Sequence, residues 1–145
     1  MSDEEVAGFL EDGRTVTCAT LGRDGWPHLQ PLWYVIRDGR LWSWTYAKSQ
    51  KVVNLRRDPR CTLQVETGTK YSELRGVMLA CEAEIHGDIE VVAPLGAAIA
   101  ARYGGADLTP ELEAAMRAQA AKRVGLEFVE RRRVTWDHRK LGGTY

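Results

Sequence analysis

The chain has 145 residues, 44% of them hydrophobic and 28% charged, which is the balance of an ordinary globular protein. Its 20 Lys and Arg are offset by 20 Asp and Glu, so no overall field exists that would attract nucleic acid or a membrane surface. This length suits a single compact domain over residues 1–145 and leaves no room for a second.

The ends and the cysteines indicate a compartment. The first five residues are acidic where a signal peptide would be basic and apolar, and the most apolar stretch, 91–101, is too short to span a bilayer. Cys18, Cys61 and Cys81 have no metal-binding spacing and are expected to be buried thiols in a reducing environment. We therefore expect a soluble cytoplasmic protein without a metal, a nucleic-acid partner or a membrane partner.

The first third of the chain predicts a short helix and a meander of strands. Ser2 and Glu5 form a capping box, and Gly13 ends the helix. Strands are expected at 14–21, 27–36 and 40–46, because these stretches are rich in β-branched and aromatic residues. They are joined by a turn at 22–25 and by the hairpin pair Asp38–Gly39.

Helical and extended patterns mix in the remainder. A short helix is expected at 52–57, strands at 61–67, 76–86 and 126–136, and a helical insertion at about 88–122. Asp88 and the Thr109–Pro110 pair are typical helix starts within that insertion. Strands and helices do not alternate along the chain as they would in a parallel sheet. A small barrel would close this set of strands and leave few exposed strand edges. The expected fold class is mainly β.

One basic segment predicts an anion site. Between residues 48 and 60 the chain carries five cations and one acid, namely Lys48, Lys51, Arg56, Arg57 and Arg60 against Asp58. Ser49 stands where a helix would begin, and Lys51 falls in its first turn, where the helix dipole disfavours a cation. A bound phosphate would remove that conflict. The alternative is a serine cap on a solvated basic helix, and the spacing alone leaves both interpretations open.

The same segment carries a family resemblance. The triplet Ser49-Gln50-Lys51 follows a strand that ends at Tyr46 and precedes the run Asn-Leu-Arg-Arg-Asp-Pro at 54–59. This pattern resembles the split-barrel superfamily of the pyridoxamine 5'-phosphate oxidases. Within it, the pattern is most similar to the B class of oxidoreductases that depend on the deazaflavin coenzyme F-420. The likeness covers about residues 14–84 and the last ten residues.

That resemblance implies a six-stranded antiparallel split β-barrel of the flavin-reductase type, and a homodimer with the cofactor in grooves at the subunit interface. Carried over by position, Ser49 and Lys51 would bind the cofactor phosphate, and Lys48 would add charge at the same end. Arg56 and Arg57 would reach an anionic tail of the cofactor. The residues expected beside the ring system are Pro31, Trp33, Trp44 and Thr45.

The choice of cofactor depends on the second strand. In the pyridoxamine oxidases that this pattern resembles, the second strand carries Arg and Lys residues that help hold flavin mononucleotide (FMN). Residues 30–35 of this chain contain no Arg or Lys. The expected function is therefore hydride transfer between reduced coenzyme F-420 and an oxidised small organic substrate. The alternatives are an FMN-dependent oxidase or reductase on the same barrel, and a non-catalytic barrel that binds a flavin, haem or lipid.

The remaining aromatic and histidine residues carry weaker predictions. Strand alternation places Trp42, Trp44 and Tyr46 on one face, suited either to stacking on a ring or to packing in a subunit interface. His28 and His86 are interpreted as ordinary surface or edge residues. No catalytic residue is assigned; Tyr46, Tyr71, water, or His138 beside Asp137 are the candidates for proton donor.

Overall fold

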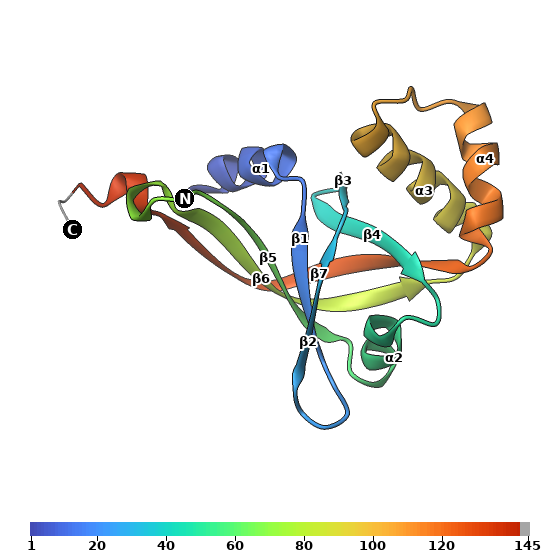
Figure 1. Ribbon diagram of the computed structural model, residues 1–145, viewed down its shortest axis with the longest axis horizontal. Helices are drawn as coiled ribbons and strands as arrows, with labels where there is room; N and C mark the ends of the chain where they lie inside the picture. Colours follow the sequence, from blue (N-terminus) through green and yellow to red (C-terminus); the bar gives the residue numbers. More distant parts are fainter. Residues whose placement is uncertain (143–145) are drawn as a thin grey trace.

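The computed structural model describes residues 1–142, which form one antiparallel sheet, four α-helices and two short 3-10 turns (Figure 1). The helices are α1 (Asp3–Asp12), α2 (Gln50–Arg57), α3 (Ile89–Gly104) and α4 (Pro110–Ala120). The strands are β1 (Val16–Leu21), β2 (Pro27–Leu32), β3 (Val35–Arg37), β4 (Arg40–Tyr46), β5 (Arg60–Thr67), β6 (Arg75–His86) and β7 (Arg123–Asp137). The 3-10 turns are η1 (Tyr71–Glu73) and η2 (His138–Lys140).

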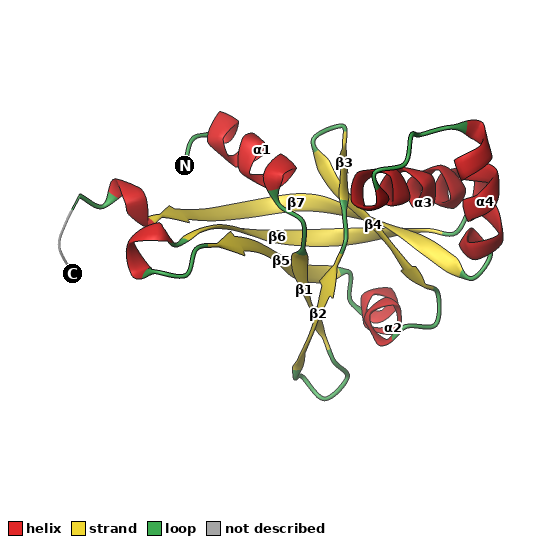
Figure 2. Ribbon diagram, turned by 45° about the horizontal axis from the view of Figure 1, so that its top comes forward, coloured by secondary structure: helices red, strands yellow, loops and turns green. Residues whose placement is uncertain are grey.

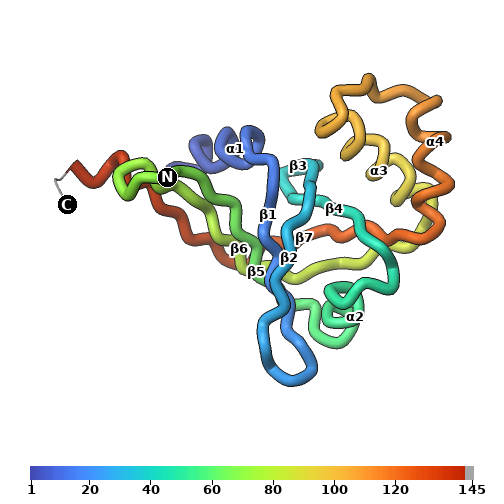
Figure 3. The backbone as a smooth tube through the Cα atoms, viewed as in Figure 1, coloured from blue at the N-terminus to red at the C-terminus, as the bar shows by residue number. Residues whose placement is uncertain are grey.

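The sheet has the strand order β2-β1-β5-β6-β7-β4-β3 and curls into a half-barrel (Figures 1 and 3). The mainly β, antiparallel prediction is confirmed. The prediction of six strands is wrong, because the described chain contains seven. The extra strand arises where the expected strand 27–36 divides into β2 and β3.

A tyrosine from the helical insertion causes this division. The backbone N–H of Tyr34 donates to the Tyr103 hydroxyl, and that hydroxyl donates in turn to the Tyr34 carbonyl, both at 2.9 Å. The Trp33 carbonyl accepts from the Ser43 hydroxyl at 2.7 Å. Side chains therefore satisfy the backbone groups that a continuous strand would pair, and the chain bends between β2 and β3.

The helix caps and the hairpin turn that the sequence predicts are present in the structure. Ser2 and Glu5 make the capping box, and the side chains of Asp88 and Thr109 cap α3 and α4. At the β3–β4 hairpin, φ is 50° at Asp38 and 73° at Gly39, as a two-residue turn of this kind requires.

The helices occupy different sides of the curled sheet (Figure 2). Helices α1 and α2 add apolar side chains to the main core inside the curl, where Val16, Leu63 and Leu126 are fully buried. Helix α3 instead packs outside, against Trp42 and Trp44 of β4. None of the helices between residues 1 and 142 combines the length and apolar character needed to cross a bilayer.

Candidate functional site

The N-terminus of α2 has unused hydrogen-bonding capacity. Ser49 is the cap residue in extended conformation, but its hydroxyl accepts no bond from the first turn. Among residues 1–142 its side chain makes one hydrogen bond, a long one of 3.5 Å in which the Thr45 hydroxyl donates. The first N–H groups of a helix have no acceptor within the helix, so those at 50–52 remain available to a ligand.

Lys51 turns inward from this helix start. Its side chain is buried, with the residue 6% exposed, and its Nζ donates to the Thr45 Oγ1 at 3.0 Å. No carboxylate of residues 1–142 forms an ion pair with it. Burial lowers the pKa of the Lys51 ammonium, while the Cys18 thiol acts to raise it. A buried ammonium without an acidic partner is uncommon, because a buried charge is costly unless it is paired.

The three cysteines are buried and unoxidised, as expected, but they lie on adjacent strands. Cys61 stands directly across from Cys81 in the β5–β6 ladder. A hydrogen bond with Cys61 lowers the pKa of Cys18, against the effect of burial and with help from Lys51. The pKa of Cys61 is raised by the same contact and by burial, and burial raises that of Cys81 to about 12.

Three of the four residues expected beside a ring share one cavity. Pro31, Trp33 and Trp44 line a space of about 480 Å³ together with Thr15 and Leu32. The Trp33 ring is half-exposed and stacks on Tyr103, with the centroids 4.5 Å apart and the planes at 5°. Each tryptophan therefore has one side supported by protein and belongs to the lining of the cavity.

Helix α3 supports the second tryptophan. A Cβ at Gly96 would lie 2.3 Å from the Trp44 ring, so only glycine lets the helix approach so closely. The Arg123 guanidinium carbon lies 4.4 Å from the ring centroid of Trp44 and 4.3 Å from that of Tyr46. Its buried Nε has no hydrogen-bond partner in the described chain. The sequence gives no signal for Arg123, because its place beside Trp44 and Tyr46 depends on the register of β4 and β7.

Thr45 belongs with Ser49 and Lys51. It follows Trp44 directly on β4, so the two side chains point to opposite faces of the strand. The residues expected to bind the phosphate and those expected beside the ring therefore form two separate clusters within one chain. Strand β3 pairs only with residues 40–42 of β4, which leaves the edge at 43–46 without a strand partner on that side among residues 1–142. A ligand in contact with both clusters would pass around this edge.

The other predicted cations lie elsewhere on α2. Lys48 is exposed just before Ser49, as a phosphate contact requires. Arg56 is exposed in the last turn, about 10 Å along the helix axis from Ser49. Arg57, beside it, donates to the Leu21 carbonyl and so fastens α2 to the β1–β2 hairpin.

The proposed pair of His138 with Asp137 does not form. The Asp137 carboxylate accepts from Arg139, a contact that lowers its pKa to about 2, and also lies beside Arg75. The Nδ1 of His138 is 2.8 Å from the Tyr71 carbonyl. This group follows the far end of β7, near the C-terminus and away from α2 (Figure 3). Of the candidate donors, only Tyr46 lies on the strand that carries Trp44.

Comparison with known proteins gives a family and a set of related folds. The sequence profile of the pyridoxamine 5'-phosphate oxidases matches residues 2–135, whereas no curated protein matches. The crystal structure of a conserved hypothetical protein from Mycobacterium tuberculosis is 46% identical, with a TM-score of 0.92 over 100% of this chain and 90% of that one.

Two other solved structures are similar in fold at low identity. An F-420 reductase is 22% identical, with a TM-score of 0.66 over 88% of this chain and 94% of the other. A FAD-binding protein from Mesorhizobium loti is 18% identical, with a TM-score of 0.70 over 93% and 94%. The fold is thus shared by structures described as binding or using different cofactors of the flavin type.

Proposed function

The chain belongs to the pyridoxamine 5'-phosphate oxidase family, and from that premise we propose that it transfers a hydride between reduced coenzyme F-420 and an oxidised organic substrate. The main support is the start of α2, where a buried lysine without an acidic partner adjoins a serine hydroxyl that caps nothing. A phosphate would accept from the free N–H groups and supply the missing negative charge near Lys51.

The residues present fit such a cofactor at both ends. Ser49, Lys51 and the exposed Lys48 would hold its phosphate, with Thr45 keeping the Lys51 ammonium at the helix start. Trp33 and Trp44 offer flat apolar surfaces for a ring system in the cavity that they line. Arg123 is a further cation beside Trp44 that an anionic part of the ligand would meet.

In this proposal the bound cofactor supplies the hydride chemistry, and the chain supplies position and a dry surface. Trp33 and Trp44 would orient the ring and exclude water from one of its sides. Tyr46, exposed on the same face of β4 as Trp44, is the side chain placed to donate a proton to a substrate there. Tyr71 and His138 are separated from it by the length of β7, about 45 Å of extended chain.

The preference for the deazaflavin rests on β2. Its outward residues, Leu29, Pro31 and the following Trp33, are uncharged, so FMN would find no cation on this strand. We expect coenzyme F-420 to bind in the micromolar range, equivalent to about −8 kcal/mol, and FMN at least tenfold more weakly. A fluorescence titration with each cofactor measures both affinities. Tighter binding of FMN would favour the FMN-dependent alternative.

The phosphate assignment is tested by Lys51→Met. Loss of a charge-assisted contact worth roughly 1.5–3 kcal/mol should weaken F-420 binding by about ten- to a hundredfold at low salt. High salt should weaken binding by the wild type and narrow that gap.

Two further variants complete this experiment. Ser49→Ala should weaken binding less than Lys51→Met, because a neutral donor is lost. Arg132→Met removes an exposed cation on β7 and is the charge-matched control, expected to bind like the wild type. Thermal unfolding of every variant identifies any failure to fold. Wild-type affinity in a folded Lys51→Met protein would refute the assignment.

A further inference from the structure

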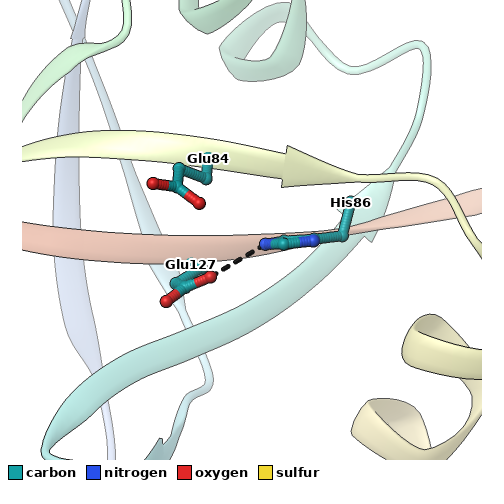
Figure 4. Close-up of side chains that lie close together, drawn as sticks. All are labelled: Glu84, His86 and Glu127. Carbon is teal, nitrogen blue, oxygen red and sulfur yellow. Dashed lines mark hydrogen bonds and ion pairs between the residues drawn. The ribbon is translucent and has the colours of Figure 1, made fainter.

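A histidine and two glutamates form a compact group on the outer face of the long strands (Figure 4). Glu84 and His86 lie two residues apart on β6, and Glu127 lies on the adjacent β7. One ligand atom from each lies within 4.8 Å of the other two. The closest pair is His86 Nε2 and Glu127 Oε2, at 2.9 Å.

The charges in this group are not balanced. Glu84 stands directly across from Glu127 in the ladder, an arrangement of like charges that destabilises a sheet. Arg40 pairs with Glu127 through the other carboxylate oxygen, Oε1. Glu84 has no hydrogen bond or ion pair with any residue in the described range 1–142. One carboxylate is therefore left without a cation.

Neighbouring side chains fix the two inner groups. The indole of Trp42 stacks on the His86 ring, with the centroids 4.9 Å apart. Arg40 holds Glu127 so that its Oε2 faces the imidazole. Groups that orient a histidine and a carboxylate in this way are typical around bound metals.

We propose that Glu84, His86 and Glu127 bind one divalent transition-metal ion, with water at its remaining positions. The metal takes the place of the proton between His86 Nε2 and Glu127 Oε2, and that proton leaves to solvent. Two such ligands on a tetrahedral zinc lie about 3.3 Å apart, so the observed pair needs little movement. Glu84 is exposed and turns in from the solvent side as the third ligand.

Ligand chemistry and access both favour this class of ion. One imidazole with two carboxylates suits zinc and its first-row neighbours better than calcium, which prefers an all-oxygen site. The side chains of His86 and Glu127 are 30% and 11% exposed, so an ion can enter from the Glu84 side. The inference is independent of the proposed cofactor site, because it involves neither α2 nor the cavity beside Trp33.

The test is calorimetric titration of the metal-free full chain with zinc chloride. We expect one ion per chain and a dissociation constant in the micromolar range or below. Glu84→Gln should weaken binding at least tenfold, and His86→Asn more. The matched control is Glu82→Gln, on the same face of β6 but paired with Arg131, and it should bind as the wild type does.

Cobalt(II) distinguishes this site from the cysteines. Bound at Glu84, His86 and Glu127 it should give visible d–d bands without a thiolate charge-transfer band, and Glu84→Gln should remove them. Because Glu84 is exposed, unpaired in the described chain and faces the like charge of Glu127, Glu84→Gln should leave the metal-free protein folded, with thermal stability equal to or slightly above that of the wild type. Absence of zinc binding, equal affinity in all variants, or a thiolate band would each overturn the proposal.

Discussion

Lys51 occupies an environment that a surface lysine never meets. Its ammonium is buried against the Thr45 hydroxyl and the Cys18 thiol, and no acid of residues 1–142 pairs with it. Such a charge lowers the stability of the ligand-free fold and favours an anionic ligand. The same side chain therefore lowers the stability of the ligand-free fold and favours binding of the ligand, a combination that is common at binding sites.

The pH dependence of stability follows from this burial. The pKa of Lys51 in the folded chain lies below its ordinary value of 10.5, chiefly because of burial, so unfolding takes up a proton in the interval between the two values. The free energy of unfolding should therefore rise with pH across that interval. Lys51→Met lacks this effect, so its gain in stability should be largest at neutral pH and vanish toward pH 10.5.

Urea denaturation at a series of pH values measures this difference. The comparison belongs in a Cys18→Ala background, because the neighbouring thiol also titrates with a lowered pKa. A stability difference that is constant with pH would mean that Lys51 is ordinarily solvated in the folded protein.

At single residues, the sequence predicted the chemical type better than the direction of the side chain. Lys48 and Ser49 lie where the motif suggests, at an open helix start. Lys51, on α2, turns inward because its ammonium donates to Thr45 of β4 and lies near Cys18 of β1. His86 was interpreted as an ordinary edge residue, and its contacts with Glu127 and Trp42 depend on strand register, which single-sequence patterns do not contain.

Among the elements, the C-terminal end of α3 connects distant parts of the chain. Arg102 donates to the carbonyls of Leu10, Glu11 and Gly13 at 3.3, 2.7 and 2.8 Å, at the end of α1. Helix α1 has no basic residue in its own last turn, so α3 supplies the cation that the helix dipole favours there. The guanidinium also lies 4.7 Å from the ring centroid of Tyr34.

We expect Arg102→Ala to lower the free energy of unfolding by roughly 2–4 kcal/mol, because three carbonyls, two of them in partly buried contacts, lose a charged donor. Arg102→Lys should recover only part of the loss, since an ammonium cannot reproduce the planar fork. Arg117→Ala, which breaks an exposed pair with Glu90, is the control and should change stability little. Urea denaturation measures all three, and equal effects of the two alanine variants would contradict this role for Arg102.

Most elements were predictable because their starts and turns are local. The caps at Ser2, Asp88 and Thr109 and the turn at Asp38–Gly39 depend on neighbouring residues alone. The division of 27–36 into two strands was not predictable, because it depends on Tyr103, 69 residues beyond Tyr34. A long-range contact of one side chain thus set a strand boundary that the local sequence pattern does not contain.

At the scale of the whole molecule, the edge strand β2 presents an apolar outer surface. Leu29 and Trp33 are 58% and 57% exposed there, and Trp26, just before the strand, is 75% exposed. Tyr46 of β4 and Val53 of α2 are also about half-exposed. Apolar exposure of this extent along one edge is typical of a surface that another protein covers.

We expect that second protein to be another copy of this chain. Light scattering should give a mass near twice the chain mass of 16.3 kDa at micromolar concentration. Leu29→Arg places a charge in the middle of the covered surface, so it should shift the mass toward the monomer while the exposed position leaves the fold intact. Val134→Arg changes an equally apolar, 47% exposed residue on β7 and should remain dimeric.

This experiment also tests whether the cofactor site needs two subunits. Pro31, which lines the cavity beside Trp33, lies on the same face of β2 as Leu29, so a partner packed against that face would also lie beside any ring bound there and protect it from water. Leu29→Arg should therefore weaken F-420 binding at protein concentrations where it is monomeric, although its side chain is not among those lining the cavity. Full affinity in that monomer would place the whole site in one chain, and a monomeric wild type would contradict the shared interface altogether.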